Sequence, residues 1–114
     1  MRLSEAIRLG AMLRPQGFGI FSAQFGAKAT CAYGAAKDAL GRDFRAVSEW
    51  PWLITEYPCP DCGLSGVAAL SIVSLHLNDY HRWTRERIAD WVETIENQQA
   101  ESTAEAIMAE MEAR

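Results

Sequence analysis

CPDCGLSGVAALSIVSLHLNDYH, residues 59–81, carries two cysteines and two histidines, and their spacing indicates how this part of the chain is held together. The spacing is C-x2-C-x13-H-x4-H, close to that of a tetrahedral Cys2His2 zinc site, and thiolate and neutral imidazole are ligands that Zn²⁺ prefers. The proline and glycine of CPDCG favour a tight turn in which backbone N–H groups approach both sulfurs. The stretch therefore predicts a closed, structural Zn²⁺ site with four ligands: Cys59, Cys62, His76 and His81.

The two histidines set a geometric condition on this site. Residues five apart on a helix point roughly 140° away from each other, so His76 and His81 can share an ion only if the helix ends or unwinds between them. We expect this to happen at Asn78-Asp79. Two alternatives stay open. Asp79 or water replaces His81 as a ligand, or no metal is bound and the four side chains are ordinary buried or hydrogen-bonded groups.

Length, charge and cysteine content limit the class of protein. The chain has 114 residues, a formal charge of -4 and three cysteines, which predicts one small domain in a reducing compartment. Net negative charge disfavours a general nucleic-acid coat. The first residues form neither a signal peptide nor a membrane span, so we expect a cytoplasmic protein. We assign a single helical domain with the zinc site (57–81) to residues 1–97, and a C-terminal amphipathic helix or tail to residues 98–114.

Hydrophobic periodicity predicts a mainly α fold of four to five helices with a zinc-knuckle-like loop. Ser4, Thr30 and Thr84 are suited to cap three of the helices, because their hydroxyls can accept a hydrogen bond from a backbone N–H. The expected helices span about residues 4–13, 30–40, 67–77, 84–97 and 102–114. The core face of the fourth helix consists of Ile88, Trp91, Val92 and Ile95.

The segments between these helices are less regular. Residues 17–26 could form a short β-hairpin or an irregular loop, because periodicity does not separate the two. Residues 50–54 should be extended, since a proline restricts the residue before it and donates no backbone hydrogen bond.

The helix between the cysteines and the histidines is poorly suited to read DNA. Residues 64–75 contain no Arg, Lys, Asn or Gln, the side chains best matched to base edges. Their apolar residues surround most of the helix, which predicts burial. Positive charge follows at Arg82, Arg85 and Arg87, beside the N-terminus of the fourth helix, where a phosphate could bind. The alternative is that these arginines are solvated or paired with nearby carboxylates.

We do not expect an enzyme. Two cysteines favour a closed metal site over an open catalytic one, and the sequence has neither a phosphate-binding glycine loop nor a serine elbow. Cys31 stands among small residues, which predicts tight helix packing and a buried, inert thiol rather than a nucleophile.

Two further stretches carry a resemblance to other proteins: residues 31–35, CAYGA, and residues 76–91, HLNDYHRWTRERIADW. Together with the CPDC knuckle they resemble the motifs C-A-x-G-A, C-P-x-C and H-L-N-D-x-H-x-W-T-R-E of a group of small uncharacterised proteins encoded by bacteria and their phages. The likeness covers most of residues 3–96 and implies no activity. Residues 57–81 also resemble a Cys2His2 zinc finger locally.

From these observations we expect a small zinc-stabilised binding or regulatory protein of phage or mobile-element type that acts through protein contacts. Residues 104–111 of the C-terminal stretch are a candidate contact surface or, alternatively, a helix folded back on the body. The alternative function is a nucleic-acid-binding accessory factor, which would use Arg82, Arg85 and Arg87.

Overall fold

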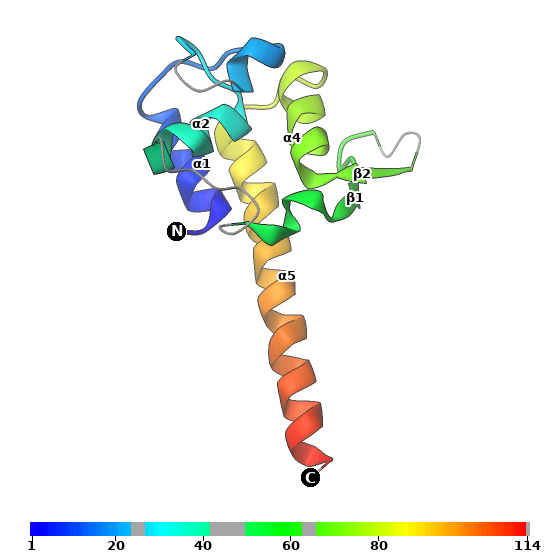
Figure 1. The fold of residues 1–114 in the computed structure, drawn as a ribbon. Coiled ribbons are helices and arrows are strands. Elements are labelled where there is room, and N and C mark those ends of the chain that lie inside the picture. Colours follow the sequence, from blue (N-terminus) through cyan, green and yellow to red (C-terminus); the bar gives the residue numbers. More distant parts are fainter. Residues whose placement is uncertain (24–26, 42–49, 63–65, 114) are drawn as a thin grey trace.

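The computed structural model describes residues 1–23, 27–41, 50–62 and 66–113. This part of the chain contains four α-helices and one two-stranded antiparallel sheet, so the predicted mainly helical fold is confirmed (Figure 1). The strands are β1 (Glu56–Pro58) and β2 (Val67–Ala69), and short 3-10 helices lie at Ile20–Ala23 and Pro51–Ile54. The α-helices are α1 (Leu3–Ala11), α2 (Ala32–Leu40), α4 (Leu70–Asp79) and α5 (Arg85–Glu112).

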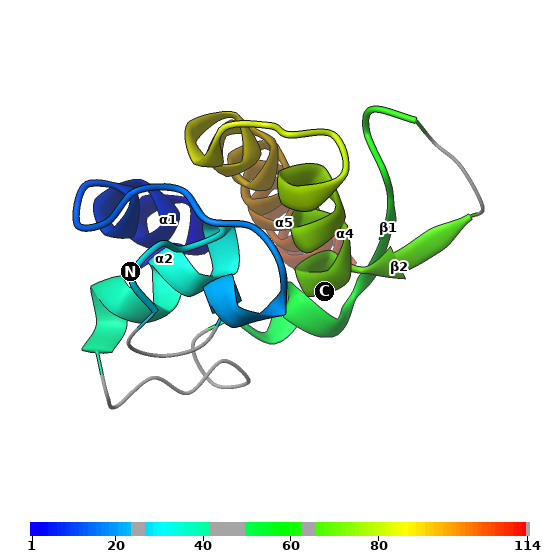
Figure 2. The same ribbon diagram turned by 90° about the horizontal axis from the view of Figure 1, so that it is seen from above.

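The helices enclose the core, and the hairpin lies at its edge. α1 packs against α2 and α5, and α4 contacts both α2 and α5. Figure 2 shows the hairpin on the far side of α4 from α1 and α2. Large side chains buried completely between these elements include Ile7, Trp50, Leu70, Leu77 and Ile88.

α1 and α2 approach each other closely at Gly10. A Cβ atom at this position would lie 1.7 Å from the carbonyl oxygen of Ala35, so only glycine allows the observed separation. The facing residues Ala32, Ala35 and Ala36 are fully buried. The small residues of the CAYGA stretch therefore serve tight helix packing, as predicted.

Cys31 is fully buried, also as predicted, and it is the N-cap of α2. Its sulfur accepts a hydrogen bond from the backbone N–H of Gly34 at 3.4 Å. The predicted cap, Thr30, lies one residue earlier and is itself buried, where its hydroxyl accepts a hydrogen bond from Arg85. The thiol of Cys31 thus has a structural place in the fold.

The start of α1 differs from the prediction. Ser4 is not the N-cap, because the helix begins at Leu3 and Ser4 is buried in its first turn. The reason is Glu96 of α5, whose carboxylate accepts hydrogen bonds from the backbone N–H of Leu3 at 2.9 Å and from the hydroxyl of Ser4. A helix N-terminus attracts negative charge, so a carboxylate from another helix joins the local Glu5, which accepts from the backbone N–H of Arg2 at 3.3 Å.

The predicted helices at 84–97 and 102–114 are one helix, α5, which Thr84 caps as expected. The Oγ1 atom of Thr84 accepts a hydrogen bond from the backbone N–H of Arg87 at 3.1 Å. Thr103 does not interrupt the helix, because its hydroxyl donates to the carbonyl of Gln99 one turn earlier. The alanines and glutamates around it also have high helix propensity.

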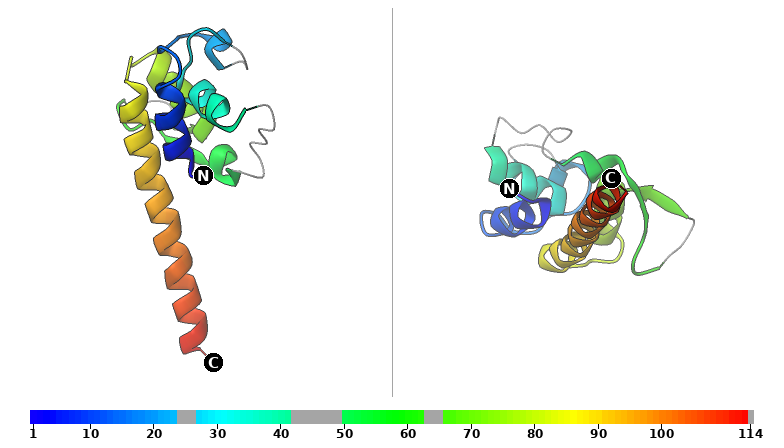
Figure 3. Two further views of the ribbon diagram at one scale, coloured as in Figure 1. Left: turned by 90° about the vertical axis from the view of Figure 1, so that its left-hand side faces the viewer. Right: turned by 90° about the horizontal axis from the view of Figure 1, so that it is seen from below.

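The predicted core face of α5 agrees with the structure. Ile88, Val92 and Ile95 are buried, and Trp91 is partly buried against the core. From Asn97 to Ala113 every residue is exposed, and this half of the helix extends away from the body (Figures 1 and 3). No helix in the described part of the chain combines the length and the apolar character needed to cross a membrane.

The predicted extended conformation of residues 50–54 is wrong. Pro51–Ile54 is a 3-10 helix, and Trp50 before it is fully buried with its indole Nε1 donating to the carbonyl of Met1. Residues 17–23 include the 3-10 helix Ile20–Ala23 and no strand of a hairpin, and residues 24–26 of the predicted segment lie outside the described residues.

The hairpin forms instead between β1 and β2. Glu56 pairs with Ala69 and Pro58 pairs with Val67. The prediction that the third helix begins near Val67 is wrong, because Val67–Ala69 is a strand and the helix begins at Leu70. A short apolar run does not distinguish a strand from a helix. The pairing holds the segment that follows β1 next to the helix that follows β2.

Candidate metal centre

The four side chains singled out as ligands meet between the end of β1 and the end of α4. Cys59 and Cys62 follow β1, His76 lies in the last turns of α4, and His81 follows that helix. One ligand atom from each residue, a sulfur or a ring nitrogen, lies within 4.8 Å of all the others. The Sγ atom of Cys62 lies 3.6 Å from Nε2 of His76. The four residues form a group that could hold a metal ion.

The end of α4 brings the two histidines together, as their spacing requires. The backbone N–H groups of Tyr80 and His81 both donate to the carbonyl of His76, at 2.8 and 3.3 Å. Arg82 then takes a φ of 57°, in the left-handed region, which turns the chain out of the helix. The imidazole centroids of His76 and His81 lie 4.7 Å apart with their planes at 88°.

Asp61 orients His81, although the sequence analysis did not single it out. Its Oδ2 atom lies 3.2 Å from Nδ1 of His81 and accepts a hydrogen bond from Nε1 of Trp83 at 2.9 Å. The other ring nitrogen of His81, Nε2, is buried and has no hydrogen-bond partner among the described residues. A histidine whose Nδ1–H is held by a carboxylate presents its Nε2 lone pair, which is how metal-binding histidines are commonly arranged. The unsatisfied Nε2 therefore fits a metal ligand.

Asp79, the alternative to His81 as a ligand, points elsewhere. Its carboxylate accepts hydrogen bonds from the backbone N–H of Gly19 at 3.0 Å and from Nδ2 of Asn78 at 2.8 Å. Asn78 is fully buried and also donates to the carbonyl of Gly17. The Asn78-Asp79 pair therefore fixes the end of α4 to the loop after α1, and His81 is the residue that completes the cluster.

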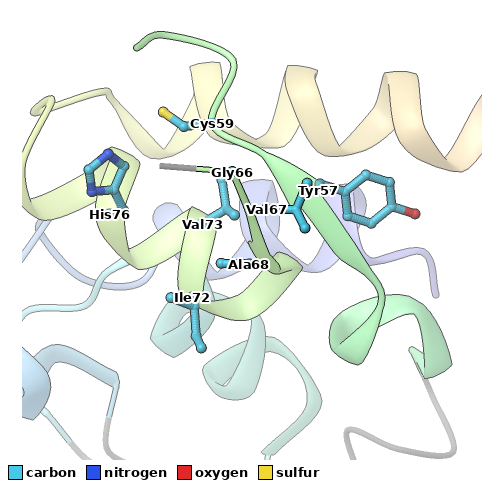
Figure 4. Close-up of a pocket in the computed structure, with 8 residues that line it drawn as sticks. All are labelled: Tyr57, Cys59, Gly66, Val67, Ala68, Ile72, Val73 and His76. Atoms are coloured by element: carbon cyan, nitrogen blue, oxygen red, sulfur yellow. The ribbon is translucent and has the colours of Figure 1, made fainter. Parts of the chain in front are cut away.

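A small pocket of about 160 Å³ lies beside the cluster, lined mainly by apolar side chains of β2 and α4. Figure 4 shows Cys59 and His76 on the side of this pocket away from the Tyr57 ring. Of the predicted buried segment 64–75, residues 64 and 65 lie outside the described residues, and burial of the others is confirmed only in part. Val73 is buried, whereas Ile72 is 60% exposed at the rim of the pocket.

Arg85, one of the three arginines predicted to bind phosphate, is inside the fold. Its side chain is 8% exposed, and burial lowers its pKa from the ordinary arginine value. Its guanidinium donates to Oγ1 of Thr30 and to the carbonyl of Arg14, both at 2.8 Å, and to the carbonyl of Ala11. Arg85 thus joins α5 to the end of α1 and is not available to an anion at the surface.

The other two arginines are exposed but stack on aromatic rings. The guanidinium of Arg82 lies 4.1 Å from the centroid of the Phe18 ring, and that of Arg87 lies 3.7 Å from the Trp83 ring. The three predicted residues therefore do not form one anion-binding surface.

Comparison of the chain with protein-family models, with curated proteins and with solved structures gave no match. No family is identified for the chain. Of the resemblances drawn from the sequence, the structure supports the local one, a Cys2His2-like cluster.

Proposed function

We propose that the four clustered residues bind one Zn²⁺ ion and that the protein is a small zinc-stabilised binding protein that acts through contacts with other proteins. The observation that carries the metal assignment is the convergence of two sulfur and two imidazole donors within 4.8 Å. This mixed donor set is typical of structural Zn²⁺ sites. The buried Nε2 of His81 supports it further, because zinc supplies the partner that this atom lacks among the described residues.

The proposed zinc is structural. Four protein ligands fill a tetrahedral site, so no coordination position is left for a substrate or an activated water molecule. This supports a protein that is not an enzyme.

Zinc would fasten the periphery of the molecule to its core. Each strand of the hairpin has only three residues, and a two-stranded hairpin is marginally stable by itself. The ligands come from the segment after β1 and from the end of α4. Because the free energy of metal binding adds to that of folding, the ion stabilises the hairpin and this helix end most.

Zinc content of the purified protein tests the assignment. Elemental mass spectrometry should find one zinc per chain, and Cys59→Ser should lose it. Cys31→Ser is the matched control, because it removes a cysteine that caps α2 outside the cluster and serine is a good N-cap. Zinc that persists in Cys59→Ser, or is absent from the wild type, contradicts the proposal.

Charge supports a protein partner over a nucleic acid. The chain has a formal charge of -4, and Arg85 is engaged inside the fold. The motifs resembling small bacterial and phage proteins lead us to propose, in addition, an accessory role of phage or mobile-element type. A labelled DNA or RNA duplex titrated at low salt should not bind. Salt-sensitive binding that is lost in the Arg82→Ala, Arg87→Ala double variant would instead support the nucleic-acid function.

A further inference from the structure

The second half of α5 extends into solvent. Ile95 and Glu96 are buried, but all residues from Asn97 to Ala113 are exposed. The first residues of this segment still contact the body, because Asn97 accepts a hydrogen bond from Arg2 and Gln99 donates one to Tyr57. Figures 1 and 3 show the rest of the segment continuing alone beyond the other elements. We call residues 97–113 the projecting helix. At 1.5 Å per residue it is about 25 Å long.

One face of the projecting helix is apolar. On a regular helix the three largest apolar residues and two of the alanines fall within about 100° of the circumference. The three large ones, Ile107, Met108 and Met111, are 52%, 60% and 66% exposed. An open groove of about 640 Å³ lies where this face meets Arg2 at the body of the molecule. The apolar stripe consists of Ala100, Ala104, Ile107, Met108 and Met111.

Acidic residues flank this stripe on both sides. Glu101, Glu105 and Glu112 fall along one edge and Glu110 along the other, by the same helical geometry. Residues 97–113 contain no lysine or arginine. The rest of the chain then holds 11 acidic residues (15 less these four) and 11 basic residues, a formal charge of zero. The net negative charge of the protein is therefore concentrated on the projecting helix.

We infer that the apolar stripe of the projecting helix is a docking surface for a basic amphipathic helix of another protein. Apolar side chains at helical spacing would cover the stripe, and lysines or arginines beside them would face the glutamates. Methionine suits such a surface because its unbranched side chain adapts to different shapes. The basic amphipathic helix is the class of partner for the proposed function. The inference therefore rests on the proposal that this protein acts through contacts with other proteins.

The same charges disfavour a second copy of this chain as the occupant. Two projecting helices packed through their stripes would bring eight glutamates together without a cation from residues 97–113 of either copy. Like charges on neighbouring helix positions are destabilising. The glutamates would attract the cations of a basic partner, whereas they would repel the glutamates of a second copy.

Two synthetic peptides test the inference on the zinc-loaded, full-length protein. Both carry leucines at helical spacing, one with lysines and the other with glutamates along the edges of the leucine stripe. Fluorescence anisotropy should show binding of the lysine peptide that weakens with salt, and no binding of the glutamate peptide. Ile107→Ser with Met111→Ser should weaken lysine-peptide binding by about tenfold or more. Glu101→Lys with Glu112→Lys leaves two lysines and two glutamates on the projecting helix and should remove its preference for the lysine peptide.

The double variant Ala106→Ser, Ala109→Ser is the matched control, because both positions face away from the stripe on a regular helix and are exposed. It should bind as the wild type does. Three results would overturn the inference: no binding of the lysine peptide at low salt, equal binding of both peptides, or a dimer in sedimentation velocity that Ile107→Ser abolishes. Zinc content, measured on the same samples, separates the two proposals, since a protein that retains zinc but binds no peptide contradicts the docking surface alone.

Discussion

The carboxylate of Asp61 accepts a hydrogen bond from the indole of Trp83 at 2.9 Å, across 22 residues of sequence. The same Oδ2 atom lies 3.2 Å from Nδ1 of His81. Trp83 in turn lies under the guanidinium of Arg87, in the first turn of α5. One carboxylate therefore connects the candidate metal centre to the start of the longest helix, and it does so without being a ligand.

Asp61→Asn should weaken zinc binding without removing a ligand. The asparagine amide can keep one hydrogen bond but carries no charge to hold the Nδ1–H of His81, and loss of such a partner lowers metal affinity by about 10- to 100-fold. Competition with a chromophoric chelator measures the affinity. Asp90→Asn is the control, because Asp90 is exposed and pairs with Arg8 away from the cluster. Equal affinities of the two variants would contradict the role given to Asp61.

Removal of zinc by a chelator should loosen one part of the molecule more than the rest. We expect faster amide hydrogen exchange in residues 56–62 and 70–81, because the proposed ion would join these segments and its binding energy would be folding energy. α1 and α2 should change less, since their contact at Gly10 and Ala35 is made without the ion. Hydrogen exchange with mass spectrometry, with and without chelator, distinguishes this pattern from uniform or unchanged protection.

Glu96→Gln should destabilise the fold by about 1–3 kcal/mol, because an amide NH₂ would stand where a carboxylate now accepts from the first turn of α1. The contacts at risk are those to Leu3 and Ser4. Glu93→Gln is the matched control on the same helix. Its pair with Arg8 is only partly buried, so its loss should cost about 1 kcal/mol or less. Urea unfolding of the zinc-loaded variants measures the loss of unfolding free energy in each. Equal losses for Glu93→Gln and Glu96→Gln would show that the buried carboxylate of Glu96 does not stabilise the fold more than the partly buried one of Glu93.

Arg85→Leu should also cost about 1–3 kcal/mol, because Thr30 and the carbonyls at the end of α1 lose their donor inside the fold. Arg87→Leu, two residues further on, removes an exposed guanidinium stacked on Trp83 and should cost about 1 kcal/mol or less. Thermal unfolding of the two variants measures the difference. The reverse order of stabilities would mean that Arg85 does not support the fold in the way its contacts indicate.

The clustering of Cys59, Cys62, His76 and His81 could be predicted from sequence because it depends on local features, namely a tight turn, one helix and an end to that helix near Asn78. The role of Asp61 could not. Its position in CPDC is compatible with simple exposure, and its function depends on where Trp83 and His81 point after α4 has ended. The start of α1 is a similar case, because Glu96, which accepts from the backbone N–H of Leu3, lies 93 residues away in the chain.

Helix boundaries were predictable only where a local cap exists. Thr84 marks the start of α5 correctly, whereas the separate helix predicted over residues 102–114 is the continuation of α5. Val67–Ala69 has the same apolar character as the helix after it, so only its pairing with β1 makes it a strand. The burial of Arg85 likewise could not be predicted from sequence, because an arginine next to a helix start is usually solvated.

Because α5 is one continuous helix, a change in its orientation is transmitted along its whole length. The helix is about 42 Å long from Arg85 to Glu112. It packs in the core as far as Glu96 and is exposed from Asn97 onward. By simple trigonometry, a tilt of the whole helix by about 10° about its start moves the far tip by about 7 Å. A small change in how Ile88 and Val92 pack in the core would therefore displace the far end of the helix by a larger distance.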